Sequence, residues 1–166
     1  MDDSSKKTAL RMIPYGLYVL TAAKGDEVAA ATVNWVTQAS FQPPLLALGV
    51  KVDSGVHRLI KESGYFALNI LKKGQQGMAF AFFKPTHREG NTINGVRFSP
   101  GTTGAPVLAA VPAYVECRLV ETVEKGDHSV VVGEVVEAVV NEPPTGRADD
   151  QTLTLKDLGE NVFYGG

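Results

Sequence analysis

Residues 31–44, ATVNWVTQASFQPP, combine Trp35, the only tryptophan of the chain, with a run of amide and hydroxyl side chains. These polar side chains are Thr32, Asn34, Thr37, Gln38 and Ser40. Amides and hydroxyls offer the donors and acceptors that the edge of a flat heteroaromatic ring requires, and an indole can stack on such a ring. The alternative is a structural role, in which Trp35 fills the interior and the polar side chains face water. The segment alone leaves both interpretations open.

The segment DSGVHRL (53–59) has the composition of a helix start, with Asp53 or Ser54 as the N-cap. Unpaired backbone N–H groups and the helix dipole make such a terminus suitable for a phosphate. Ser54 and His57 can add hydrogen bonds, and Arg58 adds positive charge. The alternative is an ordinary helix cap without a ligand.

A third candidate is the triplet Gly126-Asp127-His128, which falls at the tip of a predicted hairpin. Such a triplet is ordinarily a hydrophilic turn. The functional interpretation places His128 at the mouth of the fold, as a hydrogen-bonding group or gate beside a reacting ring. The other two histidines, His57 and His87, are far away in the sequence, so no metal site is predicted.

The standard catalytic templates are absent: the chain contains no G-x-S-x-G elbow, no Walker A loop and no G-x-G-x-x-G fingerprint. The net charge is −2, and lysine and arginine are scattered rather than collected in a stripe, so no nucleic-acid surface is expected. The length of 166 residues predicts a single domain, 1–166. The lone cysteine, the polar N-terminus and the lack of a long apolar run predict a cytoplasmic protein with no membrane partner.

The elements that must position these residues are mostly strands. Strands are predicted at 16–23, 27–36, 45–50, 65–71, 113–122 and 128–140, with short helices at 8–13, 56–64 and 75–83. The segment 84–106 is rich in Gly, Pro, Thr and Asn, and is expected to be a long irregular loop of the kind that forms lids or binding sites.

Apolar and polar residues alternate along 113–122, so Cys117 is expected on a dry face, as a small hydrophobe, and Glu116 on a wet face. The turn EKGD (124–127) joins this strand to the next. Because most strands follow one another without long crossovers, we predict a mainly β fold, a closed or nearly closed antiparallel β-barrel with a few short helices. A doubly wound sheet is the alternative and fits poorly.

Read in order, TVNWVTQASFQPPLLALGV, SGYFALNIL, VECRLVE and GDHSVVVGEV resemble the flavin reductase-like family of FMN-binding split barrels. The resemblance extends from Tyr15 to Ala138, and the Gly-Asp-His triplet before a valine-rich strand carries the most weight. It implies an antiparallel barrel of the Greek-key type.

The resemblance also implies a set of site residues. In this family the segment matching Thr32–Ser40 lines the isoalloxazine ring of the flavin, and a histidine matching His128 lies near the flavin and the incoming nicotinamide. The implied cofactor-binding residues are Thr32, Asn34, Trp35, Val36, Thr37, Gln38, Ala39, Ser40, Val50, Lys51, Ser54, His57 and Lys84, and the implied catalytic residue is His128.

The implied activity is NAD(P)H-dependent flavin reduction, with hydride transfer from NADH or NADPH to the flavin N5. FMN is favoured over FAD because only a single-phosphate pocket can be read in the sequence. Family members are usually homodimers and can supply reduced flavin to a monooxygenase partner. The C-terminal tail NVFYGG is a candidate cover for the flavin, through Phe163 or Tyr164.

The chain departs from the common family pattern at two positions. Trp35 stands where many members have a small residue, and Gln42 stands where an acidic residue usually precedes the Pro-Pro pair. A bulky Trp35 beside the ring narrows the nicotinamide site. The alternative function is therefore a flavoredoxin-like electron-transfer protein, which holds FMN, has little nicotinamide activity and passes electrons to a protein partner.

Overall fold

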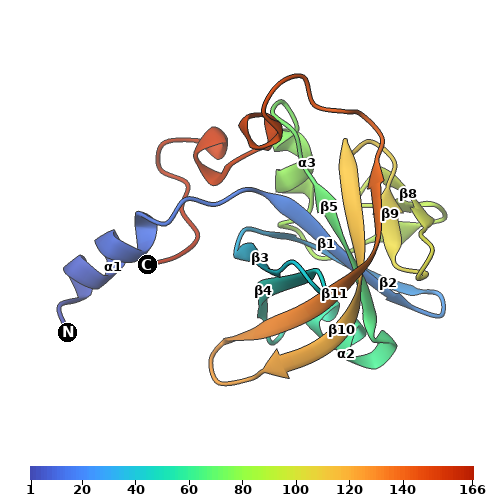
Figure 1. The fold of residues 1–166 in the computed structure, drawn as a ribbon, viewed down its shortest axis with the longest axis horizontal. Coiled ribbons are helices and arrows are strands. Elements are labelled where there is room, and N and C mark those ends of the chain that lie inside the picture. Colours follow the sequence, from blue (N-terminus) through green and yellow to red (C-terminus); the bar gives the residue numbers. More distant parts are fainter.

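A computed structural model describes residues 1–166, in which most of the regular secondary structure is antiparallel β-strand (Figure 1). Seven strands form one sheet in the order β2-β1-β5-β10-β11-β4-β3. Their bounds are β1 (Tyr18–Lys24), β2 (Glu27–Val33), β3 (Val36–Ser40), β4 (Leu45–Lys51), β5 (Tyr65–Ile70), β10 (Ala113–Val123) and β11 (His128–Val140). This arrangement confirms the mainly β, antiparallel fold that the sequence predicts.

A second, four-stranded sheet lies beside the first. It consists of β6 (Arg88–Glu89), β7 (Thr92–Ile93), β8 (Val96–Pro100) and β9 (Pro106–Leu108). The helices are α1 (Asp3–Arg11), α2 (Gly55–Ser63) and α3 (Gln76–Ala81), with 3-10 turns η1 (Ala148–Gln151) and η2 (Leu155–Leu158). Helix α1 has no buried residue and extends away from the sheets, and the C-terminus lies beside it (Figure 1).

The two edge strands of the large sheet, β2 and β3, are consecutive in the chain. The sheet is therefore rolled, which brings its two edges close together. Only Asn34 and Trp35 separate them. No strand pairing joins β2 to β3, which leaves the roll split along this line. The chain therefore crosses from one edge of the sheet to the other through the two residues that the sequence marks as ring-binding.

Helix α2 packs one face against β1 and β2, while its other face is exposed to solvent. Val56, Leu59 and Ile60, at the i, i+3, i+4 spacing, are all buried in the interior cluster with Phe66. Ser54 caps the helix by accepting a hydrogen bond from His57 N, and Gly64 ends it at φ 78°. The predicted cap and stop of this helix are both confirmed.

The predictions for two regions are wrong. The segment 84–106 is not an irregular loop but carries most of the small sheet, β6 to β9. Glu116 is not on a wet face, because its side chain is fully buried under residues 101–104. Its carboxylate accepts hydrogen bonds from the backbone N–H of Thr102 (2.9 Å) and Thr103 (2.7 Å) and from the Thr103 hydroxyl. A buried carboxylate requires such donors, so Glu116 ties this loop to β10.

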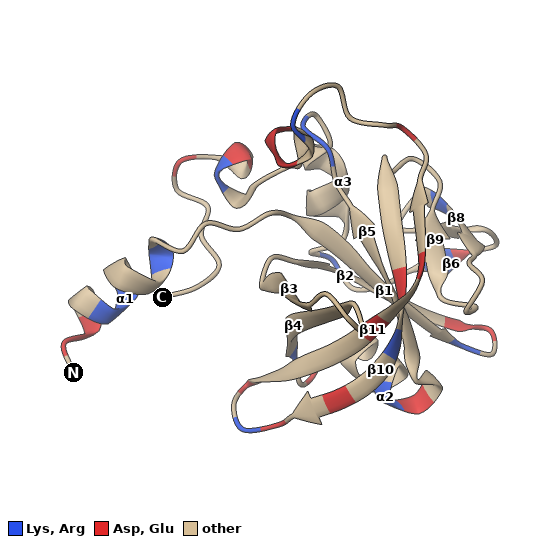
Figure 2. Ribbon diagram, in the orientation of Figure 1, with Lys and Arg blue, Asp and Glu red and all other residues tan.

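Charged residues of both signs are interspersed along the chain, without a continuous stretch of one sign (Figure 2). None of the helices combines the length and the apolar character that crossing a membrane would require.

We expect Gly133→Ala, in β11, to destabilise the fold by about 1–3 kcal/mol, the usual range for overpacking a core. A Cβ added there would lie 2.4 Å from Phe66 Cζ and 2.9 Å from Cys117 Cβ, and both side chains are fully buried. Chemical denaturation measures the loss. The control is Gly126→Ala at the hairpin tip, where the nearest atom lies 3.7 Å away. Equal stability of the two variants would contradict the packing described here.

Candidate functional site

Three aromatic side chains from distant parts of the chain meet at the split in the roll. The Trp35 ring centroid lies 4.7 Å from that of His128 and 5.3 Å from that of Tyr164. Asn34 joins them, because its Nδ2 donates a hydrogen bond to the Tyr164 carbonyl at 3.1 Å. Three of the predicted ring-binding or catalytic residues are thus brought together, with Tyr164 as their common neighbour.

The sheet register explains this convergence. His128 is the first residue of β11 and pairs with Lys51, the last residue of β4. The Trp35 carbonyl accepts a hydrogen bond from Gly49 N, also in β4, at 2.9 Å. Gly49 leaves the room that the indole needs, since a Cβ there would lie 2.8 Å from Trp35 Cε3. Strand β4 therefore positions both Trp35 and His128.

A hydrogen-bonded chain runs from Asp127 through His128 to Tyr164. His128 Nδ1 lies 2.9 Å from Asp127 Oδ1, and Nε2 lies 2.7 Å from the Tyr164 hydroxyl. An ionised carboxylate only accepts, so a neutral His128 donates through Nδ1 and accepts from Tyr164 through Nε2. The hydrogen bond from His128 lowers the pKa of Asp127, which keeps that carboxylate ionised.

The pKa of Tyr164 is raised, mainly because its hydroxyl is partly buried. The Lys51 ammonium opposes this shift, while the Asp127 and Asp53 carboxylates add to it. Tyr164 therefore stays a neutral phenol at physiological pH. The three charges act on one hydroxyl, which places the Lys51–Asp53 ion pair (3.3 Å) close to the aromatic cluster.

Trp35 Nε1 is a buried donor with no hydrogen-bond partner in the structure. Orphaned buried N–H groups are rare and ask for an explanation. The isoalloxazine ring of a flavin carries nitrogen and carbonyl acceptors along its edge, so a flavin placed against Trp35 would satisfy this donor. The donor set at this corner fits a flavin.

Strand β3 forms an open wall beside this cluster. Thr37, Gln38 and Ala39 are exposed, and Val36 and Ser40 are half-buried at its two ends. The segment is thus a half-exposed strand, and Trp35 lies outside the apolar interior cluster. The structural alternative, in which Trp35 fills the barrel, is not what the structure has.

The predicted phosphate end lies at the junction of β4 and α2. Ser54 Oγ accepts from His57 N at 3.2 Å and donates to the Lys51 carbonyl at 2.7 Å, which is a standard N-cap arrangement. Lys51 and Asp53 are exposed next to it. The N-terminal end of α2 thus offers backbone N–H groups, the Ser54 hydroxyl and the Lys51 ammonium within a short stretch.

Four predicted residues lie elsewhere. The side chain of Val50 is in the apolar interior, and His57, only 8% exposed, faces Ser129 Oγ at 2.8 Å. The Thr32 hydroxyl donates to the Ala79 carbonyl of α3 at 2.6 Å. Lys84 is exposed just after α3 and forms no ion pair. The side chains of Val50 and His57 therefore have structural neighbours and no open face toward a ligand.

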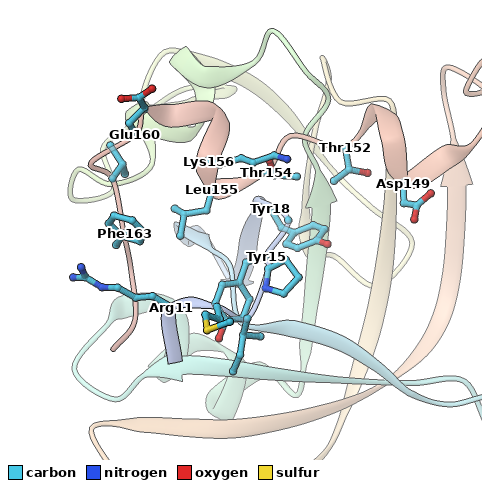
Figure 3. A pocket seen from close by; sticks show the side chains of 16 residues that line it. Arg11, Tyr15, Tyr18, Asp149, Thr152, Thr154, Leu155, Lys156, Glu160 and Phe163 are labelled. Atoms are coloured by element: carbon cyan, nitrogen blue, oxygen red, sulfur yellow. The ribbon is translucent and has the colours of Figure 1, made fainter. Parts of the chain in front are cut away.

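A pocket of about 560 Å³ borders the C-terminal tail (Figure 3). Tyr15, Tyr18, Leu155 and Phe163 line it together with residues of the segment that follows α1. Apart from Phe163, a predicted cover, none of the predicted site residues lines it. Burial raises the pKa of Tyr18, so its phenol is also neutral. The tail separates the two regions: Phe163 lines the pocket, and Tyr164 covers Trp35.

Sequence reasoning missed this pocket and ranked Tyr164 only as one of two candidate covers. The sequence signal for the pocket was weak, because it consisted only of Tyr15 and Tyr18 on either side of Gly16. In the structure, a Cβ on Gly16 would lie 2.4 Å from the Tyr18 hydroxyl oxygen. No local pattern indicates that the tail folds back on Trp35. Cys117, expected in the core, is fully buried there, and burial raises its pKa to about 12.

The rolled sheet defines a domain of the split-barrel class. The family model "Flavin reductase like domain" matches residues 10–156, and the chain belongs to that family. The NADH:FAD oxidoreductase SgcE6 of Streptomyces globisporus C-1027 is similar, with 31% identity, a TM-score of 0.68, and coverage of 77% of this chain and 71% of that one. A second SgcE6 structure contains NAD and FAD fragments.

BorF, the flavin reductase component of a bacterial two-component tryptophan halogenase, superimposes with a TM-score of 0.76 at 26% identity, over 98% of this chain and 96% of that one. Diflavin flavoprotein A 1 of Synechocystis sp. is 34% identical over 134 residues. That match covers 80% of this chain and 23% of the relative. The chain thus spans about a quarter of the length of the curated relatives that it matches.

We expect Gly49→Ala to displace the indole of Trp35 from its neighbours, because the new Cβ would lie 2.8 Å from Trp35 Cε3. Near-ultraviolet circular dichroism and the emission of the single tryptophan report its position. Gly55→Ala is the matched control, since its Cβ would make an ordinary 3.5 Å contact with Ala29. Spectra of Gly49→Ala identical to those of the wild type would refute the described fit between Gly49 and Trp35.

Proposed function

We propose that residues 1–166 form a single domain that binds FMN and reduces it with NADH or NADPH. The observation that carries this proposal is the meeting of Asn34, Trp35 and His128 at one corner, with the unpaired Trp35 Nε1 among them. SgcE6 and BorF, both named as flavin reductases or flavin oxidoreductases, support it.

The chain's residues have separate tasks in this proposal. Trp35 supplies an N–H donor for the ring edge, and Asn34 supplies an amide beside it. The exposed wall of β3, from Thr37 to Ser40, follows the ribityl chain. Ser54, Lys51 and the first N–H groups of α2 hold the phosphate. FMN is favoured over FAD because only one phosphate-binding helix terminus is proposed, and FMN carries a single phosphate.

When bound, the flavin accepts a hydride at N5, chemistry that belongs to the cofactor itself. The protein must hold the two rings in contact and exclude water. His128, fixed by Asp127, places Nε2 next to Trp35, where it can accept a hydrogen bond from the nicotinamide amide. Lys84, an exposed cation without an ion-pair partner, is the candidate for stabilising negative charge at the flavin edge.

We also propose a cytoplasmic homodimer that passes electrons to a monooxygenase or another electron-transfer protein. Helix α1 buries none of its residues in the single chain, and Leu10, Met12 and Ile13 are exposed, as expected for an arm that packs on a second copy. BorF is the reductase component of a two-component halogenase, which supports a protein partner for the reduced flavin.

A second candidate function is an FMN-binding electron carrier with little nicotinamide activity. Two observations favour it. Trp35 and Tyr164 narrow the space beside His128, and the curated relatives are diflavin flavoproteins of which this chain spans about a quarter. In such a protein the electrons would come from another flavin or protein instead of a nicotinamide.

The test of function is the visible spectrum of the purified protein after incubation with FMN, followed by anaerobic addition of NADH or NADPH. We expect flavin absorption bands that bleach on addition of the nicotinamide. Bands that bleach only with dithionite would favour the electron carrier. Absence of flavin bands would contradict both functions.

The phosphate site has its own test. Ser54→Asp keeps a good N-cap for α2, so stability should change by less than about 0.5 kcal/mol. The new carboxylate repels a phosphate at the same N–H groups, and we expect FMN affinity to fall about tenfold or more. Riboflavin, which lacks the phosphate, is the matched ligand and should bind both proteins equally. Unchanged FMN affinity would show that the phosphate binds elsewhere, and an equal loss for riboflavin would show that the substitution does not act through the phosphate.

A further inference from the structure

The last four residues of the chain lie on the residues that the proposed function assigns to the flavin ring. These residues are Asn34, Trp35 and His128, and Tyr164 contacts each of them. Its ring centroid is 5.3 Å from that of Trp35, its hydroxyl is 2.7 Å from His128 Nε2, and its carbonyl accepts a hydrogen bond from Asn34. A flavin ring seated against Trp35 needs the same stacking face, the same amide and the same histidine. The two cannot be accommodated together.

The backbone of the tail lies equally close. A Cβ at Gly165 would sit 3.7 Å from Trp35 Nε1, so the chain covers the orphaned indole donor without bonding it. Gly165 and Gly166 have φ values of 137° and 96°, which side-chain-bearing residues rarely adopt. The two glycines thus allow the segment to lie flat over the indole.

Helix α1 also contacts the tail, through Arg11. The Arg11 guanidinium of α1 lies 4.4 Å from the Phe163 ring centroid, and its Nε donates to the Gly165 carbonyl at 3.3 Å. No strand pairing involves the tail, and Phe163 and Tyr164 remain 48% and 43% exposed. Individual contacts of these kinds change an equilibrium constant by about tenfold at most. Such a segment can be displaced by a ligand.

We propose that Phe163–Gly166 acts as a built-in competitor, which occupies the ring position in the ligand-free chain and is displaced when a flavin binds. This inference rests on the proposed function. The measured affinity for a flavin is then lower than the intrinsic affinity by the fraction of molecules in which the tail is open. Tyr164 sets that fraction, and with it the selectivity for flat ligands that can take over all three contacts.

Displacement would also change the surroundings of the site. Phe163 is one of the residues that line the 560 Å³ pocket (Figure 3), and the neighbouring Tyr164 lies against Trp35. Movement of the tail would therefore alter the lining of the pocket and the cover of Trp35 together.

The test compares Tyr164→Ala and Tyr164→Phe with Tyr65→Ala, the same change at an exposed tyrosine of β5. The first readout needs no flavin: acrylamide quenching of Trp35, the only tryptophan. The second is FMN affinity, followed through flavin fluorescence. We expect Tyr164→Ala to make Trp35 more accessible to the quencher and to bind FMN about tenfold more tightly. Tyr164→Phe, which loses only the bond to His128, should show a smaller gain, and Tyr65→Ala none.

Each other outcome overturns the proposal in a distinct way. Unchanged quenching in Tyr164→Ala would mean that the tail does not cover Trp35 in solution. Increased quenching with weaker FMN binding would make Tyr164 a contact of the bound flavin and not its competitor. If quenching increased but FMN bound to none of the variants, the tail would cover Trp35 but the proposed function would be wrong. The tail would then have no flavin to compete with, and the proposal would fail for that reason.

Discussion

The burial of one apolar cluster between the rolled sheet and α2 is the contact on which the other features depend. Leu59, Ile60 and Phe66 are fully excluded from solvent there, and burial of each such side chain contributes about 1.5–3 kcal/mol. Only three residues join β4 to α2, so the packing of α2 on the sheet fixes its N-terminus at the end of β4, beside Lys51. Asn34 and Trp35 carry the chain between β2 and β3, the two edges of the same sheet. The site is therefore a consequence of how the interior is packed.

Local patterns predicted the parts of the fold that local interactions determine. The spacing of apolar residues in α2, its capping by Ser54 and its end at Gly64 all appear in the structure. The small sheet in 84–106 was not predicted, because two- to five-residue strands are too short to show a periodicity. Glu116 was assigned to a wet face, because strand alternation carries no information about a loop that later covers that face.

Some residues of the candidate site were predictable from the sequence, and others were not. Local composition and family resemblance selected Asn34, Trp35 and His128, which the register of β4 brings together. They also selected His57 and Val50, whose side chains face inward, because a motif does not reveal which side of a strand or helix faces a ligand. The cover of Tyr164 over Trp35 joins residues about 130 positions apart, and no local signal in the sequence encodes such a contact.

Glu116 has a consequence for how β10 can pair. A slip of one residue between neighbouring strands moves every side chain to the opposite face. Such a slip would turn the carboxylate of Glu116 toward the apolar interior, away from the N–H groups of Thr102 and Thr103, and would leave a buried charge without donors. The hydrogen bonds of Glu116 therefore favour one alignment of β10 with its neighbours.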